Sequence, residues 1–257
     1  MLRHFTSQVK PPLVTTPHAV APTSSPPCWI LTRQRSGSTL LANLMNQSFE
    51  DFEMHEWFGR GAGQYGHHTQ NDFDMSPMKF RHTKLHDRRL LDVFPSLDHI
   101  ETALPGIQYV YLVRSDIFAR TVSIYFARMT KQWYLRADDK GFFDKVIPFY
   151  GSILVDIYEE ELELQNKWPE VLKEREFIEI QYEEVTKRPA KTIRRIGNYL
   201  NLVPTPFEDV QIDSLPMTRP ETPEYIERLK ELVGHDDEPS DEPSDDPSDE
   251  PREAKIY

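Results

Sequence analysis

The chain of 257 residues contains a single cysteine, Cys28, so no disulfide can form within it. This scarcity is typical of proteins that work in a reducing compartment. Cys28 lies in a short apolar run, which indicates a small buried side chain rather than a nucleophile. No apolar run reaches the length of a membrane-spanning helix. These absences predict a soluble protein, and we expect it in the cytoplasm.

A surplus of basic residues is also missing, because the formal net charge is −12. Ten carboxylates and two cations lie between Asp236 and Lys255, which gives that segment −8 and leaves −4 for the rest of the chain. No basic face for nucleic acid is therefore expected. Because prolines recur through this acidic segment, we expect residues 235–257 to form a disordered tail that either solubilises the protein or contacts a partner.

Residues 1–27 contain six prolines and many Ser and Thr, but no acidic residue and no apolar core of a secretory signal. The composition predicts a disordered leader, with an organelle transit peptide as the alternative. We expect one folded domain over residues 28–234.

Within this domain, apolar and β-branched runs at 28–32, 107–113 and 177–180 predict strands. Helical patterns follow after Asp116, which is expected to cap a helix, over 149–168, and from Pro189. Alternating strands and helices predict an α/β protein, a P-loop-type three-layer fold with a central parallel sheet flanked by helices. Ligands of such sheets bind at the carboxyl ends of the strands.

The turn after the first predicted strand resembles a phosphate-binding loop without its lysine. Gly37 fits the second glycine of the pattern G-x-x-x-x-G-K-[ST], whereas Ser38 takes the lysine position and Thr32 the first glycine. The cations of the loop are Arg33 and Arg35. A strand, a tight turn and a helix aim backbone N–H groups and the helix dipole at one point. The turn therefore predicts a phosphate or sulfate site, and disfavours an ordinary ATPase or GTPase.

Three ordered segments, 34–41, 111–123 and 180–202, together resemble the sulfotransferases that use 3′-phosphoadenosine 5′-phosphosulfate (PAPS). The resemblance extends from Trp29 to Leu232 and is greatest to the bacterial trehalose 2-sulfotransferase branch. It implies a soluble sulfotransferase that moves a sulfuryl group from PAPS, without a metal, to a hydroxyl of a carbohydrate or glycolipid. It is also compatible with a homodimer.

By position, the resemblance places Arg35 to Thr39 at the 5′-phosphate and the sulfuryl group of the donor, and Arg114 and Ser123 at the 3′-phosphate. Arg219 falls where the family has a late basic loop that reaches the nucleotide. The expected donor-binding residues are Arg33, Gln34, Arg35, Ser36, Gly37, Ser38, Thr39, Leu40, Arg114, Ser123 and Arg219.

Transfer also needs a base for the acceptor proton and a cation for the charge that develops. His55-Glu56-Trp57-Phe58 resembles the segment that carries the catalytic glutamate of the trehalose branch, so we expect Glu56 to be the general base. Glu53 and His55 are its rivals. Arg35 is expected to stabilise the transition state.

The stretch from Gly59 to Arg89 is polar, and we expect it to be irregular and to shape the acceptor site. His82 and His86 are four residues apart, a spacing that would place them on one face of a helix. With His67 and His68 they form a weaker hypothesis of a metal site, for which no further ligand is evident.

Two other function classes fit the same residues. The first is a P-loop kinase that uses ATP and Mg²⁺, against which the serine in the lysine position counts. The second is an inactive nucleotide-binding module that presents its acidic tail to a partner. Binding of a 3′-phosphorylated nucleotide, compared with ATP and Mg²⁺, separates the kinase from the sulfotransferase.

Overall fold

The computed structural model describes residues 25–58, 68–86, 90, 92–133, 145–165, 167–206 and 218–234. The expected leader up to residue 24 and the expected tail from residue 235 lie outside the described residues.

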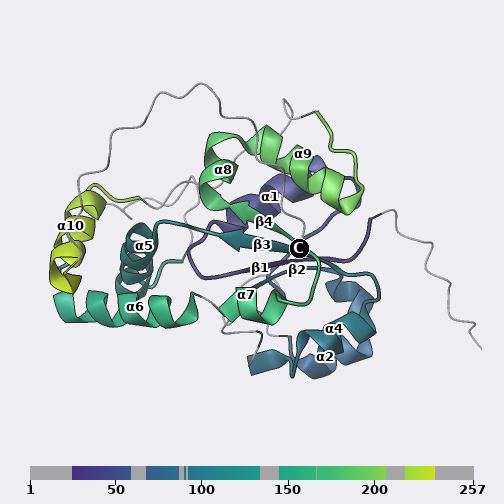
Figure 1. Cartoon of the computed structure of the whole chain (residues 1–257), viewed down its shortest axis with the longest axis horizontal. Helices are drawn as coiled ribbons and strands as arrows, with labels where there is room; N and C mark the ends of the chain where they lie inside the picture. The colour runs from purple at the N-terminus through teal and green to yellow at the C-terminus, as the bar shows by residue number, and fades with distance from the viewer. Residues whose placement is uncertain are drawn as a thin grey trace, which may run out of the picture.

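Four parallel strands form the centre of the described structure (Figure 1). They are β1 (Cys28–Thr32), β2 (His82–His86), β3 (Gln108–Val113) and β4 (Phe177–Gln181), in the order β2-β1-β3-β4. The register pairs Cys28 of β1 with both His82 and Gln108, and Tyr109 with Phe177. All carboxyl ends therefore lie at one edge of the sheet. The predicted parallel sheet flanked by helices is confirmed; β1, β3 and β4 follow the apolar runs of the sequence, whereas β2 was not predicted.

Helices cover both faces of the sheet, which makes three layers (Figure 1). One face carries α1 (Ser38–Ser48), α8 (Tyr182–Lys187) and α9 (Pro189–Leu200), and the other carries α2 (Gln70–Met75), the 3₁₀ helix η1 (Pro77–Phe80), α4 (Leu97–Ala103) and α7 (Lys167–Leu172). Strand side chains alternate between the two cores, as pleating requires. Cys28 and Ile30 of β1 lie in the first core, whereas Trp29 and Leu31 lie in the second.

A third group of helices stands beside the carboxyl ends of the strands (Figure 1). It consists of α5 (Ile117–Thr130), α6 (Gly151–Leu164) and α10 (Thr222–Val233), which share a separate apolar core. Asp116 caps α5, because its carboxylate accepts a hydrogen bond of 2.8 Å from the backbone N–H of Ala119. Among the described residues, no helix combines the length and the apolar composition that crossing a membrane requires.

Three expectations from the sequence need correction. His82 and His86 lie on a strand, β2, and not on a helix. The stretch expected to be irregular also contains α2 and η1, although residues 59–67 and 87–89 lie outside the described residues. The single helix expected over 149–168 ends at Leu164, and Pro169 lies within the separate helix α7, where the first turn needs no N–H donor.

Candidate active site

The turn between β1 and α1 has the strained geometry of an anion-binding loop. Arg35 has φ 61° and Gly37 has φ 83°, so both adopt the left-handed conformation. A methyl group at Gly37 would overlap the ring of Tyr182, so this position accepts only glycine. No side chain caps α1, and its first turn contains no acidic residue. The N-terminus of α1 therefore keeps its positive dipole end free of local carboxylates.

Arg35 and Ser123 lie in direct contact although they are 88 residues apart. The Nε of Arg35 donates to the Oγ of Ser123 at 2.9 Å, and its Nη1 donates to the carbonyl of Trp133. Burial lowers the pKa of Arg35 to about 10, helped by the charge of Arg114 and opposed by Tyr182. At neutral pH the guanidinium stays charged, so it can bind an anion.

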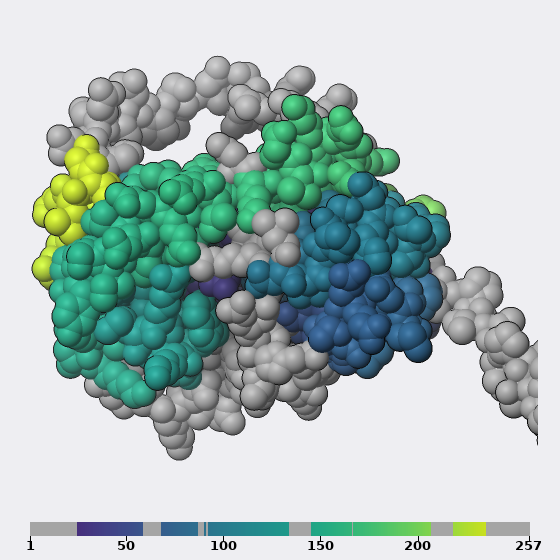
Figure 2. All heavy atoms as spheres, turned by 90° about the horizontal axis from the view of Figure 1, so that it is seen from below, coloured from purple at the N-terminus to yellow at the C-terminus, as the bar shows by residue number. Residues whose placement is uncertain are grey.

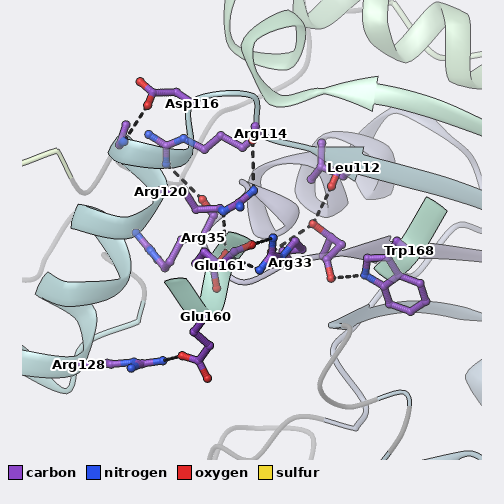
Figure 3. A network of polar contacts seen from close by, with 12 residues as sticks. Arg33, Arg35, Leu112, Arg114, Asp116, Arg120, Arg128, Glu160, Glu161 and Trp168 are labelled. Carbon is purple, nitrogen blue, oxygen red and sulfur yellow. Dashed lines mark hydrogen bonds and ion pairs between the residues drawn. The ribbon is translucent and has the colours of Figure 1, made fainter. Parts of the chain in front are cut away.

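Arg114 follows the end of β3 and completes this group. Its Nη1 donates to the carbonyl of Arg35 at 3.2 Å, and its guanidinium lies 4.9 Å from the centre of the Tyr182 ring. The structure therefore brings together Arg35, Arg114 and Ser123, three residues that the sequence predicts as one site. We call these three residues the arginine–serine grip; Figure 3 shows its two arginines.

Two buried polar atoms beside the loop show that the grip suits a phosphorylated ligand. The Oγ of Ser36 and the Nε of Arg114 have no hydrogen-bond partner among the described residues. Buried donors of this kind are normally satisfied. Oxygen atoms of a phosphate or sulfuryl group would satisfy both, so the residues present fit a donor that carries such groups.

Arg33 points away from this grip. Its Nη1 donates to the carbonyl of Glu161 at 2.6 Å, and its Nη2 lies 2.9 Å from the Oε2 of the same residue on α6. Arg120 of α5 reaches the same Oε2 with its Nε at 2.9 Å. All three side chains are buried, at 4% exposure each. Arg33 is thus bound to a carboxylate from another element, unlike Arg35.

A lysine missing from the loop is supplied by the neighbouring strand. Lys84 of β2 places its Nζ 2.8 Å from the Oγ1 of Thr39, in the first turn of α1, and 3.0 Å from the Oε2 of Glu56. It therefore joins the loop to the carboxylate that the sequence predicts as the base.

Glu56 lies between two basic side chains of β2. Its Oε1 is 3.6 Å from the Nε2 of His86, and its Oε2 is held by Lys84. Burial would raise the pKa of Glu56, but the hydrogen bond from His86 and the charge of Lys84 outweigh it and lower that pKa well below its ordinary value. Glu56 is therefore ionised at neutral pH and able to accept a proton.

The two rivals of Glu56 contact each other instead. The Nε2 of His55 lies 3.0 Å from Glu53, whose side chain is 83% exposed. The backbone of His55 bridges to β2, because its carbonyl accepts from the N–H of Lys84 at 3.0 Å. This bridge fixes the segment that carries Glu56 next to β2.

Four other predicted residues have varied surroundings. Ser38 is buried at the start of α1, Gln34 is half-buried, and Leu40 packs against the first core. Arg219 is buried against Phe126 of α5, 5.5 Å from that ring, and its Nη2 donates to the carbonyl of Lys145. Phe126 belongs to the core of the helical group, so Arg219 packs against that group.

The histidines of the metal hypothesis have separate partners. His82 is stacked on Phe52, and its Nε2 lies 3.1 Å from the carbonyl of Pro26. His86 contacts Glu56, and His68 lies 3.9 Å from Asp72. His67 lies outside the described residues. Across the described ranges no group of three or more metal-binding side chains occurs.

Sequence reasoning missed Lys84, His86 as a partner of Glu56, and the pair Arg120 and Glu161. For the first two a signal exists, because Lys84 and His86 are two residues apart and therefore share one face of a strand. Recognising β2 as a strand would have placed both beside the loop. Nothing in the sequence connects Glu161 with Arg33, since 128 residues separate them.

One comparison with known proteins identifies a family. The family model described as "Sulfotransferase family" matches residues 69–206, more than half of the chain. The comparison with curated protein sequences gives no significant match.

Solved structures similar to this chain include three sulfotransferases. A sulfotransferase from Alicyclobacillus acidocaldarius is 13% identical with a TM-score of 0.43, and the match covers 83% of this chain and 98% of that one. A mouse sulfotransferase in complex with PAP is 15% identical with a TM-score of 0.39, over 72% and 62% of the two chains. The sulfotransferase domain of the Synechococcus olefin synthase is 16% identical with a TM-score of 0.38, over 82% and 95%.

Proposed function

The chain belongs to the sulfotransferase family, and on that premise we propose that it transfers a sulfuryl group from PAPS to a hydroxyl of a carbohydrate or glycolipid. The convergence of Arg35, Arg114 and Ser123 beside the N-terminus of α1 is the observation that supports PAPS as the donor. PAPS carries anionic groups at both its 5′ and 3′ positions, and two arginines with one free helix end match that charge.

On the donor side, the N-terminus of α1 and Arg35 bind the 5′-phosphate and the sulfuryl group, while Arg114 and Ser123 bind the 3′-phosphate. Arg35 donates to Ser123 in the described state, so it turns from that hydroxyl toward the donor when the donor binds. Ser123 is then released for the 3′-phosphate. In the reaction, the acceptor oxygen forms a bond to sulfur while the bond from sulfur to the bridging phosphate oxygen breaks in line. The positive groups of the loop stabilise the charge that develops on that oxygen.

On the acceptor side, Glu56 takes the proton of the attacking hydroxyl. A carboxylate whose pKa is well below its ordinary value is a weak base, and Lys84 is one cause of that low pKa. Lys84 also contacts Thr39 in the loop, so it lies within reach of both sides of the reaction. When Lys84 turns toward the sulfuryl oxygens, Glu56 loses a neutralising cation and becomes a stronger base.

The acceptor class follows from the likeness of residues 55–58 to the glutamate segment of the trehalose 2-sulfotransferase branch. Membership of that branch, a cytoplasmic location and a homodimer form part of the same proposal. Incubating the protein with labelled PAPS and a panel of sugars, glycolipids and phenols tests the acceptor class directly. Transfer to phenols alone would contradict it.

Thermal unfolding with two nucleotides tests the donor. We expect 3′,5′-diphosphoadenosine to raise the unfolding midpoint far more than ATP with Mg²⁺, because a ligand that binds only the folded state stabilises it. The variant Arg114→Ala should lose this preference for the 3′-phosphorylated nucleotide. Stabilisation by ATP with Mg²⁺ alone would favour the kinase alternative. Nucleotide binding without transfer to any hydroxyl of the panel would favour the inactive module.

A further inference from the structure

A closed ring of contacts includes two residues of the grip, Arg35 and Arg114, and its single anion is Glu161 (Figure 3). Glu161 pairs with Arg33, and the backbone connects Arg33 to Arg35 two residues later. Arg114 contacts the carbonyl of Arg35 at 3.2 Å, and Arg120 contacts the carbonyl of Arg114 at 3.2 Å. The Nε of Arg120 then returns to Glu161 at 2.9 Å.

Glu161 is buried where it neutralises two guanidinium groups at once. Its Oε2 lies 2.9 Å from both Arg33 and Arg120, and its own carbonyl accepts a second bond from Arg33. Buried charges need such partners, because an unpaired charge in a low-dielectric interior is costly. The ring therefore depends on a residue that belongs to α6 and not to the loop.

Both arginines held by Glu161 lie directly beside residues of the grip. Arg33 and Arg35 belong to the same turn, so holding the Arg33 side chain fixes where the Arg35 backbone leaves β1. Arg120 fixes the carbonyl of Arg114, the residue that contacts Tyr182 on its other side. A shift of Glu161 would consequently move the two arginines of the grip relative to each other.

We propose that Glu161 is a positioning residue that sets the spacing between Arg35 and Arg114 and thereby the recognition of a 3′-phosphorylated donor. This inference rests on the proposed function. Glu161 touches neither substrate; it acts by holding Arg33 and Arg120 against α6. It also keeps these two cations from binding the donor phosphates in place of Arg35 and Arg114.

The same two helices offer a matched control. Glu160, the neighbour of Glu161 on α6, pairs with Arg128 of α5 at 2.7 Å, and both side chains are more than a third exposed. The pair joins the same two helices as Glu161 and Arg120, but at a partly exposed position instead of a buried one. Glu160→Gln and Arg128→Lys therefore repeat the chemical changes away from the grip.

The test measures the ratio of affinities for 3′,5′-diphosphoadenosine and adenosine 5′-phosphate, by calorimetry on the full chain. Glu161→Gln should reduce that ratio at least about tenfold, because small displacements of binding groups have effects of this size. Arg120→Lys, which keeps the charge but loses one of its two contacts, should reduce it in the same direction. Glu160→Gln and Arg128→Lys should leave the ratio unchanged.

A merely structural role for Glu161 would lower the unfolding midpoint and leave the ratio intact, and that result overturns the inference. If Glu161→Gln does not fold, the ratio of nucleotide affinities measured for Arg120→Lys tests the inference instead. A wild-type chain that does not prefer the 3′-phosphorylated nucleotide overturns the proposed function together with this inference. A wild-type preference that survives both variants overturns only the role of Glu161.

Discussion

Among single residues, the arrangement of charges around Glu56 has the clearest chemical consequence. Lys84 and His86 leave β2 on the same side and enclose one carboxylate, so the proposed base and the loop share a cation. This arrangement divides the positive charge of the site between two strands, with Arg114 following β3 and Lys84 on β2. It also explains how a loop with serine in the lysine position keeps a lysine within reach.

Replacing Glu56 by glutamine tests its role as the base. The substitution removes the proton acceptor and keeps the shape, so kcat should fall by about 10² to 10⁴ while binding of 3′,5′-diphosphoadenosine persists. Because the pKa of Glu56 lies well below its ordinary value, kcat/KM of the wild type should stay flat between pH 8 and pH 5. Steady-state rates with labelled PAPS measure both effects.

Two further variants, His86→Asn and Glu53→Gln, are compared with Glu56→Gln. His86→Asn should lower the rate less than Glu56→Gln, and Glu53→Gln should leave it unchanged. A large loss in His86→Asn, retained turnover in Glu56→Gln, and a rate that falls with acid would together assign the proton transfer to His86.

The sequence could predict the residues of the grip because each follows a recognisable local signal. Arg35 lies in a turn between an apolar strand and an amphipathic helix, and Arg114 directly follows a second strand. Lys84 has only a weaker signal, its spacing of two residues from His86, and Glu161 has none, because its role depends on packing between distant segments. Strand β2 was missed since His82-Thr83-Lys84-Leu85-His86 contains three basic or titratable residues, although four of its five positions are buried.

Among the elements, helix α5 links the loop between β1 and α1 with the helical group. Its cap, Asp116, lies in sequence between Arg114 and Arg120, which both belong to the ring that Glu161 closes. Its first turn therefore sets the path of the backbone that carries Arg114. Loss of the Asp116 cap should therefore lower the stability of α5 and alter the geometry of the grip.

Asp116→Ala should lower the free energy of unfolding by about 1 kcal/mol, as the loss of an N-cap usually does. It should also weaken binding of 3′,5′-diphosphoadenosine, because Arg114 is displaced. Urea unfolding and calorimetry measure the two effects. The control is Thr69→Ala, which removes the side-chain cap of α2 on the far face of the sheet. Equal weakening of nucleotide binding in both variants would contradict a local role for Asp116.

The helical elements were predicted less well than the strands, for reasons that the structure makes plain. The cap at Asp116 and the start of α9 at Pro189 follow from residue preferences at helix ends. The break between α6 and α7 within 149–168 does not follow from such preferences, because Gln165 still has a helical conformation at the end of α6. Trp168 of α7 instead donates to the carbonyl of Thr32 at 2.8 Å, a tertiary contact that the helical pattern does not reveal.

At the scale of the whole molecule, Cys28 offers a probe of global unfolding. It is fully buried in β1, between β2 and β3, and burial raises the pKa of its thiol well above the ordinary value. A thiol that is both buried and protonated does not react with alkylating reagents. Its modification therefore requires that the central sheet opens.

We expect labelling of Cys28 to be slow in buffer and to accelerate with urea in step with the loss of circular dichroism. A saturating nucleotide that binds the folded state should slow it further, by the factor that mass action gives. Cys28→Ala should take up no label. Rapid labelling in buffer, independent of urea, would show that β1 is exposed by local motion and would contradict the buried position.

Because β1 lies between β2 and β3, the residues around the loop form two groups that can mutate independently of each other. Lys84, His86 and the segment with Glu56 lie on one side of the loop, and Arg114, Ser123 and the ring of Glu161 come from the other. Mutations that remodel the chain between α1 and β2 can therefore accumulate without touching the second group. Under the proposed roles of these residues, a lineage built on this plan can change its acceptor while it keeps its donor.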